Sequence, residues 1–595
     1  MSRLATLPVS LPQPSSPKPP NDLAERILTS FDNLTEDCFV EDATWRDSYA
    51  VTGTLRTFYG TASISRAWKD CLKLSKASIF TIAPIPPEEM RLPGGSFWME
   101  IGYGFETDDS YCIALVSVVP DPAGGSGWKI WVLRTILQQL KGAPRIDVYD
   151  PSAADGGGMV NGNGTTTNGT SQESSYQFDC VIVGAGQAGL DAAARCAAQE
   201  ISYVVIDKQA RMGDNWRNRY DSARLHTVRE YAHLPYERTF DESYPEYLHK
   251  DDLAQAYARY VEKMHINVWL SSLLQSGQWD ESRQKWTLHV KTDGVSREVA
   301  SHFVILAVGA GGQVPSLPML PGREKFKGVV LHSEEYRSSK GFAGRRGVVV
   351  GSANTAHDVA DDMLDAGLAS VTMVQRSKTF VLPQEWYVQT QTKLYNAALP
   401  TDTGDMLSNT YPNAVFRLIG SATFHTLARM DPGRFEALEN AGFRVDVFGD
   451  PAYHLFERLG GHYMDVGVSA KIAAGQIKMK SDAALTHYTA SGLGFADGTE
   501  LPADLIVFAS GFDLNMKNQV KELFGEEVAG KFGDFTTMNE EGEASGAYKF
   551  CHPGLVCVGG AIGPARWYTR LVVLSIKASL MGKPLKLYLG EKRLK

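Results

Sequence analysis

Two stretches in the middle of the chain share one pattern of hydrophobic and polar positions. In the first, the apolar run FDCVIV (178–183) leads into a glycine turn, an alanine-rich stretch and the apolar run YVVI (203–206). In the second, RGVVV (346–350) leads into a similar turn, a stretch with helical spacing and VTMV (371–374). Short buried strands that alternate with helices are typical of a parallel sheet with helices on its faces. The pattern predicts two α/β units of the nucleotide-binding type.

The chain before residue 150 follows a different pattern. Ile27, Phe31 and Leu34 recur at helical spacing, and residues 61–74 (TASISRAWKDCLKL) predict a second helix. Three segments rich in aromatic and β-branched residues follow, and each predicts an antiparallel strand: SFWMEIGYGFE (96–106), YCIALVSVV (111–119) and GWKIWVLRTIL (127–137). Helices followed by a meander predict an α+β domain over residues 22–147.

The order of these elements, together with ATWRD (43–47) and TFYGTASISRAW (57–68), resembles the cone-shaped domain of nuclear transport factor 2 (NTF2) and SnoaL-like proteins. The resemblance implies either a cone that encloses a catalytic pocket or a cone that only mediates contacts. We favour the second interpretation.

Polar segments flank this domain on both sides. Residues 1–21 contain no long apolar run, which predicts a disordered terminus and no signal peptide. Residues 148–177 consist mostly of Gly, Asn, Thr and Ser, which predicts a flexible linker. The N-G-T triplets at Asn163 and Asn168 fit linker composition better than glycosylation.

Composition narrows the class of protein. A hydrophobic content of 43% and a charged content of 21% fit a soluble globular protein, and a net charge of −9 argues against a nucleic-acid binder. No apolar run is long enough for a transmembrane helix. The seven cysteines include no C-x-x-C pair, which argues against a disulfide framework or a metal site and favours a reducing, cytoplasmic location. The sequence leaves a homodimer open.

The first glycine turn carries the residues that dinucleotide binding requires. Gly184, Gly186 and Gly189 form G-x-G-x-x-G, which permits a tight turn, a close approach of backbone to pyrophosphate and close packing of the helix. Asp207 lies 23 residues after Gly184, where it can accept hydrogen bonds from ribose hydroxyls. We therefore assign FAD to this unit, with Gln187, Ala188 and Lys208 as further candidate contacts.

The second turn is a variant of the same fingerprint. It consists of Gly351-Ser352-Ala353-Asn354-Thr355, and the methyl group of Ala353 stands where backbone should approach phosphate. The following strand ends in Arg376-Ser377 where the first unit has a carboxylate. Arg376 can pair with a ribose 2′-phosphate, which predicts NADPH, although a solvated cation at a strand end is the plainer alternative.

A short segment between the two units carries a family resemblance. FKGVVLHSEEYR (326–337) has the form F-x-G-x-x-x-H-x-x-x-Y, and the strand end Ser510-Gly511-Phe512 follows the second unit. With the two glycine loops in this order, it resembles the identifying motif of class B flavin-dependent monooxygenases, in particular the flavin-containing monooxygenases. GDNWRNRYDSARLHT (213–227) is similar to the family's G-G-x-W-R segment and its continuation, and the likeness covers about residues 178 to 590.

The resemblance implies two nested Rossmann-type domains and a reaction. We expect an FAD domain over 178–338 and 503–595 and an NADPH domain over 339–502. Within the second, residues 381–465 are too long for a simple crossover and predict a lid or substrate wall. By resemblance, NADPH reduces FAD, O2 adds at flavin C4a to give a hydroperoxide, and one oxygen atom enters a small to medium apolar organic substrate.

The resemblance also suggests site residues. Asn215, Trp216 and Arg217 would line FAD, and Gly511 would lie at the cofactor. His226 stands near the position where many members carry an active-site Asn, in a Leu-His segment closer to the plant YUCCA branch, and would lie near the flavin and nicotinamide. A purely structural histidine is an equal alternative. His332 would act at the joint between the two domains, where it would couple reduction to oxygenation.

Four alternatives remain at this point. A flavin disulfide reductase shares both nucleotide folds but needs a redox cysteine pair, which the sequence lacks. An NADPH oxidase that releases H2O2 and a Baeyer–Villiger oxygenase share all the motifs, although Baeyer–Villiger members usually end the motif in Trp where this chain has Tyr336. A catalytically idle flavoprotein scaffold leaves the intact glycine loops unexplained.

Overall fold

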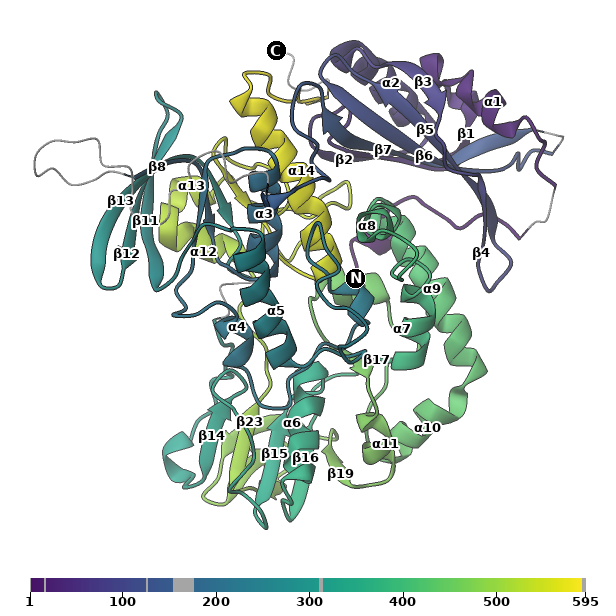
Figure 1. The fold of residues 1–595 in the computed structure, drawn as a ribbon. Coiled ribbons are helices and arrows are strands. Elements are labelled where there is room, and N and C mark those ends of the chain that lie inside the picture. The colour runs from purple at the N-terminus through teal and green to yellow at the C-terminus, as the bar shows by residue number, and fades with distance from the viewer. Residues whose placement is uncertain (1, 15–17, 125–126, 153–175, 310–313, 591–595) are drawn as a thin grey trace, which may run out of the picture.

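The computed structural model describes residues 2–14, 18–124, 127–152, 176–309 and 314–590 (Figure 1). Three sheets with their helices form an N-terminal domain, a first nucleotide-binding domain and a second one, and a helical arch runs from the second back to the N-terminal domain. No described helix combines the length and the apolar character that a membrane crossing requires.

The N-terminal domain is one sheet with helices α1 (Leu23–Leu28) and α2 (Thr61–Ser75) beside it. The sheet has the order β2-β1-β7-β6-β5-β3, with β4 on β5. The bounds of its strands are Phe39–Ser48 (β1), Leu55–Tyr59 (β2), Ser78–Ile82 (β3), Glu88–Arg91 (β4), Phe97–Glu106 (β5), Ser110–Pro120 (β6) and Trp128–Leu140 (β7). The second helix and the three strands predicted from the sequence are confirmed.

Strands β1 and β2 were missed because their buried faces carry polar side chains. Arg46 and Asp47 lie near the end of β1 and are at most 2% exposed, so the strand shows no apolar alternation. β1 pairs in parallel with β7 and antiparallel with β2, which extends the meander beyond the three expected strands.

The expected disorder of residues 1–21 is wrong for the described part of this segment. Leu4 is 1% exposed, and the Glu457 carboxylate accepts hydrogen bonds from the backbone N–H groups of Arg3 and Leu4 at 2.7 and 3.3 Å. The indole N–H of Trp131 donates to the Ser10 carbonyl at 3.0 Å. Apolar side chains and side-chain caps from distant parts of the chain therefore order a segment whose composition alone predicts disorder. The expected linker at 148–177 lies mostly outside the described residues.

The first nucleotide-binding domain is built on a sheet of order β10-β9-β8-β13-β12-β11. β24 pairs with the last residues of β13. The strands are Tyr176–Val183 (β8), Tyr203–Ile206 (β9), Val268–Trp269 (β10), Ser272–Asp280 (β11), Lys285–Thr292 (β12), Val295–Leu306 (β13) and Leu555–Cys557 (β24). The main helices are α3 (Gln187–Ala198), α4 (Asp214–Arg217), α5 (Lys250–Lys263), α12 (Met516–Phe524), α13 (Glu526–Ala529) and α14 (Ile562–Leu580). α14 packs against α3 and is buried along most of its length, so it is a core helix as expected.

The second domain is a five-stranded sheet of order β14-β23-β15-β16-β19, in which all neighbouring strands are parallel. Its strands are Val329–His332 (β14), Arg346–Val350 (β15), Ser370–Val374 (β16), Ile477–Lys480 (β19) and Leu505–Phe508 (β23), with helices α6 (Asn354–Asp365) and α11 (Val468–Ala473). A small antiparallel sheet adds Leu485–Tyr488 (β20), Gly492–Phe495 (β21) and Glu500–Pro502 (β22). β14 and β23 thus belong to the second sheet, although the expected boundaries at 338 and 503 place both with the first.

The segment expected to form a lid is a helical arch (Figure 1). It begins with β17 (Phe380–Pro383), returns through β18 (His462–Asp465), and contains a π-helical turn at Tyr453–Glu457. The helices between are α7 (Gln384–Gln391), α8 (Thr401–Asn409), α9 (Asn413–Met430) and α10 (Pro432–Asn440). In Figure 1, α8 and the start of α9 lie below the N-terminal sheet, and α10 lies near the second nucleotide domain.

Buried arginines fasten the N-terminal domain to the rest of the chain. The Arg46 guanidinium on β1 donates to both carboxylate oxygens of Glu543, each at 2.7 Å, and both side chains are 2% exposed. From α14, Arg570 donates to Asp147 at 2.6 and 2.8 Å and to the Leu137 carbonyl at 2.9 Å. Because each arginine uses several donors, the N-terminal domain is docked in a fixed orientation.

Candidate active site between the two nucleotide loops

The first glycine loop has the geometry that the fingerprint requires. Gly184 has φ +106°, and a Cβ there would lie 2.5 Å from the Ala307 carbonyl oxygen. A Cβ on Gly189 would lie 1.8 Å from the Gly184 carbonyl oxygen, so only glycine lets α3 approach β8 so closely. At Gly186 a Cβ would meet only the Asn215 side-chain nitrogen, at 3.4 Å, so its open side faces the residue expected to contact the flavin nucleotide.

The acid at the end of β9 also stabilises this loop. Asp207 accepts the Ala185 N–H at 2.6 Å through one oxygen and the Gln209 N–H at 2.8 Å through the other. Each carboxylate oxygen has a second lone pair, so capacity for ribose hydroxyls remains. Gln187 at the start of α3 is held by Tyr257 and by Asp191, Ala188 is buried, and Lys208 is exposed.

The turn at 213–217 lies beside the first loop and is tightly braced. The Arg217 guanidinium donates to the Asp214 carboxylate at 2.9 Å and to the Met212 carbonyl at 2.7 Å. The hydrogen bonds of Arg217 therefore shape the turn. Trp216 is half-buried, and the Arg219 guanidinium lies 4.2 Å from the centre of its ring. These contacts support packing of the turn beside a cofactor more than direct recognition by Arg217.

The second glycine loop resembles the first in backbone and differs in its side-chain contacts. Gly351 has φ +141°, and a Cβ there would lie 2.5 Å from the Ala509 carbonyl oxygen. Ser352 hydrogen bonds with the Thr379 hydroxyl at 2.7 Å, and the Asn354 side chain accepts the Met464 N–H at 2.9 Å. Ala353 is the N-cap residue of α6, and its extended φ of −100° is ordinary for alanine. Thr355 is half-buried in the first turn of α6.

Cations gather where β16 ends, beyond the one expected from the sequence. Arg376 is exposed, and its guanidinium has no partner among the described residues. Arg444 donates to the Arg376 carbonyl at 2.5 Å, and Arg458 donates to the Ser377 hydroxyl at 3.1 Å. These two arginines come from the arch and were missed because the sequence places them about 70 to 80 residues away. The positive cluster suits a phosphate monoester.

His226 lies at the contact between the two nucleotide domains. Its Nε2 is 3.1 Å from Asp358 Oδ1, and the Tyr220 hydroxyl donates to Asp358 Oδ2 at 2.8 Å. Asp358 belongs to α6 of the second domain, whereas Tyr220 and His226 follow α4 of the first. The sequence singled out His226 as a candidate but not Asp358 or Tyr220, because a pair that forms across two domains leaves no local signal.

A second histidine, His357, lies at the contact between the two nucleotide domains and shares the Tyr463 ring with His226. His357 stacks on Tyr463 with ring centroids 3.5 Å apart, and His226 meets the same ring edge-on at 6.4 Å. Burial lowers the pKa of His357 to about 4, so it is neutral at physiological pH. Its Nδ1 then donates to the Ala353 carbonyl at 3.0 Å, which ties the residue to the second glycine loop.

Unpartnered polar atoms concentrate around this contact. Among the described residues, buried atoms without a hydrogen-bond partner include Ser222 Oγ, His226 Nδ1, Thr227 Oγ1 and His357 Nε2. Native proteins rarely leave buried polar groups unpaired, so these atoms are available to a polar ligand or to water. The loops, the acid at one strand end and the cations at the other therefore fit two dinucleotides.

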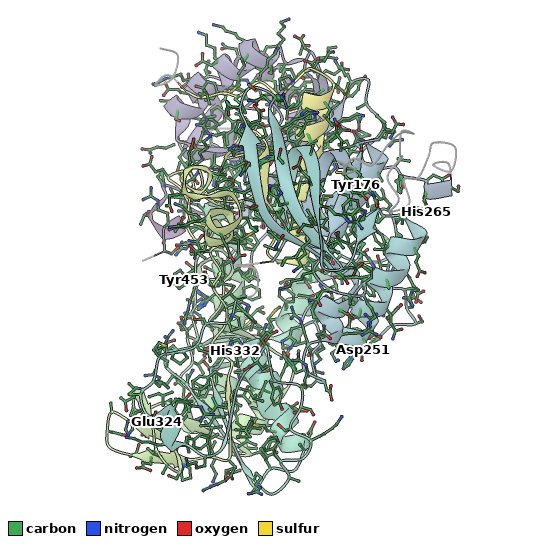
Figure 2. All side chains as sticks on the ribbon, turned by 90° about the vertical axis from the view of Figure 1, so that its left-hand side faces the viewer. Tyr176, Asp251, His265, Glu324, His332 and Tyr453 are labelled. Carbon is green, nitrogen blue, oxygen red and sulfur yellow. The ribbon has the colours of Figure 1, made fainter. Side chains whose placement is uncertain are left out.

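His332 has a different environment from His226. Its Nε2 donates to the Gly511 carbonyl at 3.1 Å, and its Nδ1 accepts the Glu334 N–H at 3.1 Å. Burial lowers its pKa, in keeping with a neutral ring. Figure 2 shows His332 near the narrow region between the lower domain, where Glu324 lies, and the rest of the molecule. Both ring nitrogens are engaged by backbone, so His332 fixes the end of β23 and Gly511 and holds no proton available for chemistry.

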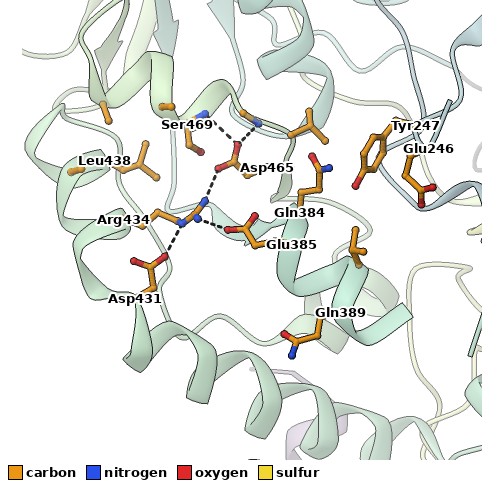
Figure 3. Close-up of a pocket in the computed structure, with 16 residues that line it drawn as sticks. Glu246, Tyr247, Gln384, Glu385, Gln389, Asp431, Arg434, Leu438, Asp465 and Ser469 are labelled. Atoms are coloured by element: carbon orange, nitrogen blue, oxygen red, sulfur yellow. Dashed lines mark hydrogen bonds and ion pairs between the residues drawn. The ribbon is translucent and has the colours of Figure 1, made fainter. Parts of the chain in front are cut away.

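A pocket of about 1090 Å³ opens beside the arch, between α7, α10, α11 and the segment at Tyr247 (Figure 3). Arg434 crosses it and pairs with Asp431 at 3.1 Å, with Glu385, and with Asp465 at 3.7 Å. None of the lining residues belongs to a glycine loop. The pocket therefore flanks the candidate active site, and the arch reaches that site elsewhere, where the Gln391 side chain accepts the Val228 N–H at 3.4 Å.

The cysteines do not form a redox centre. All seven are free thiols, and burial raises the pKa of Cys180 well above that of an ordinary thiol. A thiol held protonated is a poor nucleophile, which argues against a disulfide reductase.

The chain is similar in sequence to pyridine nucleotide oxidoreductases and to monooxygenases. The profile of the pyridine nucleotide-disulphide oxidoreductases matches residues 181–392. The chain is 29% identical over 343 residues to the indole-3-pyruvate monooxygenase YUCCA1 of Oryza sativa subsp. japonica, which covers 58% of this chain and 78% of the relative. It is 28% identical over 389 residues to the indole-3-pyruvate monooxygenase YUCCA8 of Oryza sativa subsp. indica, and this match covers 64% of the chain and 85% of the relative.

These relatives are monooxygenases by name, and the chain is similar to them over more than half of its length. This similarity agrees with FAD and NADPH, the two dinucleotide cofactors that the glycine loops of the chain predict. Solved structures similar to the chain include a flavin-containing monooxygenase from Stenotrophomonas maltophilia, with 19% identity, a TM-score of 0.46 and 68% of this chain and 99% of that chain covered. Another is an oxidized steroid monooxygenase bound to NADP, with 16% identity, a TM-score of 0.49 and 68% and 84% covered.

Proposed function

We propose that this enzyme uses NADPH and O2 to insert one oxygen atom into a small to medium apolar organic substrate, and that the second atom leaves as water. The balanced reaction is substrate + O2 + NADPH + H⁺ → oxygenated substrate + NADP⁺ + H2O. Bound FAD supplies the electron transfer and the oxygen chemistry, which protein side chains do not provide. The observation that carries the proposal is the opposite charge at the two strand ends, Asp207 in one unit and Arg376 in the other.

The chain's own residues have distinct roles in this proposal. The loop at Gly184, Gly186 and Gly189 would hold the FAD pyrophosphate, with Asp207 on its ribose. The loop at 351–355 would hold the NADPH pyrophosphate, and the cations at Arg376 would select the 2′-phosphate. His226 would contact the bound nicotinamide nucleotide, and His332 would fix the joint between the domains.

The arch is the proposed substrate wall. Its α7 end contacts Val228, two residues from His226, and Tyr395 meets Tyr231 edge-on with centroids 4.9 Å apart. Aromatic side chains from the arch therefore approach the His226 segment and would exclude water from it.

We also infer that the N-terminal domain is an NTF2-like unit without a catalytic role. Its interior is filled by Trp45, Trp68, Trp98 and Trp131, each at most 1% exposed. Its polar face is used for docking against α14 and the arch. A cytoplasmic location remains our prediction, which the seven free cysteines support.

The experiment follows NADPH, O2 and H2O2 together in the purified, FAD-loaded protein. Probe substrates cover three reaction types: indole-3-pyruvate, which the relatives' name specifies, thioanisole for heteroatom oxygenation and cyclohexanone for ketone oxygenation. With ¹⁸O2, we expect one labelled atom in the product of at least one probe and less H2O2 per NADPH than without substrate. Stoichiometric H2O2 and unlabelled probes throughout would instead establish an NADPH oxidase.

A further inference from the structure

The contact between His226 and Asp358 has a defined direction. A carboxylate oxygen only accepts hydrogen bonds, so the Nε2 atom that lies 3.1 Å from Asp358 Oδ1 carries the proton. The other carboxylate oxygen accepts the Tyr220 hydroxyl at 2.8 Å. Each oxygen thus has one donor, and the side chains of His226 and Asp358 are both 4% exposed.

This arrangement leaves one ring nitrogen without a role inside the protein. His226 Nδ1 is buried and has no hydrogen-bond partner among the described residues. In a neutral ring with Nε2 protonated, Nδ1 is an acceptor, and burying an acceptor without a donor is unfavourable. A bound molecule that supplies the missing N–H or O–H group removes this penalty.

The pair forms only when the two nucleotide domains are in contact. Tyr220 and His226 belong to the first domain, and Asp358 lies on α6, one turn after the second glycine loop. Asp221 N–H also donates to the Arg337 carbonyl at 2.7 Å, next to the joint at His332. The same contact therefore connects the state of His226 to the position of the second domain.

We propose that Asp358, braced by Tyr220, is a positioning residue that holds His226 with its proton on Nε2, so that Nδ1 accepts a hydrogen bond from an N–H or O–H group of bound NADPH. The proposal rests on the function proposed above only in its choice of ligand. A carboxylate that holds an imidazole in one tautomer is an established way to orient a functional ring, and replacing it by an amide permits the wrong tautomer. Other groups near the ring are Tyr463, His357 and His462.

The first test determines the tautomer without NADPH and without turnover. The NMR signals of the His226 ring are assigned by comparing two FAD-loaded proteins with ¹⁵N-labelled histidines, the wild type and His226→Gln. We expect the Nε2–H form in the wild type and a substantial Nδ1–H population in Asp358→Asn. Asp361→Asn is the matched control, because Asp361 lies on the same helix and pairs with Lys471 instead.

The second test measures NADP⁺ binding to the same FAD-loaded variants by calorimetry. We expect Asp358→Asn and His226→Ala each to weaken NADP⁺ binding about tenfold, the double variant to be no weaker than either, and added imidazole to restore binding to His226→Ala. Tyr220→Phe keeps the Asp358 carboxylate and its charge. It should weaken NADP⁺ binding about threefold, and it replaces Asp358→Asn in this test if that variant fails to fold.

The outcomes separate this proposal from the proposed function. An unchanged tautomer in Asp358→Asn, or full NADP⁺ affinity in both single variants, overturns the role of Asp358. If tautomer and affinity change as expected while no probe is oxygenated, the positioning role stands and the oxygenase assignment fails.

Discussion

The buried Arg46–Glu543 pair makes the docking of the N-terminal domain measurable. Arg46 also donates to the carbonyls of Asn409 and Tyr411 at 2.7 and 2.8 Å and to the Tyr568 hydroxyl at 2.8 Å, so one guanidinium contacts three separate segments. In Glu543→Gln, the charged guanidinium of Arg46 would face a neutral amide. In Arg46→Met, the Glu543 carboxylate would keep only the Thr57 hydroxyl, at 2.6 Å, as a side-chain partner among the described residues.

The expected effect follows from the burial of both charges. Breaking a buried ion pair by removing one partner costs about 3–5 kcal/mol, because the other charge is left without compensation. For docking, this corresponds to an affinity about 100- to 5,000-fold lower. Replacing both partners in Arg46→Met/Glu543→Leu should cost less than either single change, since no charge is then left buried.

The assay separates docking from folding. A protease site placed between residues 153 and 175 allows the purified protein to be cleaved, and the off-rate of the N-terminal fragment is followed by exchange with a labelled copy. Changes in affinity within one interface act mostly on the off-rate. Circular dichroism of each fragment checks that the folds themselves survive.

A matched control lies at the edge of the same interface. Arg56 pairs with Glu541 at 2.8 Å with 22% and 26% of the side chains exposed, so Glu541→Gln should cost only about 0.2–1 kcal/mol. Equal off-rates for Glu543→Gln and Glu541→Gln would refute the argument from burial. If the N-terminal domain docked more weakly in Arg46→Met/Glu543→Leu than in both single variants, the argument from charge would be refuted.

Three further predictions concern the cofactor domains. Arg376→Ala should raise KM for NADPH about tenfold and leave KM for NADH unchanged, and Lys378→Ala is the control. If the variant retained its preference for NADPH, Arg376 would be only a solvated cation. His332→Ala should raise the H2O2 released per NADPH several-fold and weaken NADP⁺ binding, because the clamp on Gly511 is lost, while unchanged coupling and affinity would leave the motif a family signature. His357 has a pKa of about 4 in the fold and about 6.5 when unfolded, so its contribution, on the order of 3 kcal/mol, is full above pH 6.5 and is lost as the pH falls toward 4. The urea midpoint of His357→Phe should therefore depend less on pH than that of the wild type between pH 7.5 and 5, and an equal dependence would contradict this assignment.

Local patterns predicted the parts of the fold that local interactions determine. The strands before Gly184 and Gly351 are apolar because both faces of a parallel sheet are covered. The glycines are needed because any Cβ would clash with a carbonyl oxygen of the neighbouring strand. These features are visible in a single window of sequence.

Long-range contacts decided the parts that were missed. β1 was hidden by Arg46 and Asp47, whose burial makes sense only with partners from other segments. Residues 2–14 were expected to be disordered, yet Glu457 and Trp131 hold them. The placement of β14 and β23 in the second sheet, and the pair of His226 with Asp358, likewise depend on which segments meet in space.

The distance along the chain between Arg46 and Glu543 has a consequence for biosynthesis. The two residues are separated by 497 positions. At a translation rate of about 5–20 residues per second, Glu543 leaves the ribosome roughly 25 to 100 seconds after Arg46. During that interval the docking face of the N-terminal domain lacks its main anion, and the Arg570 side chain that binds Asp147 is made later still. Docking of the N-terminal domain must therefore wait until α14 has been made, and nascent chains that stop before α14 would leave this face exposed.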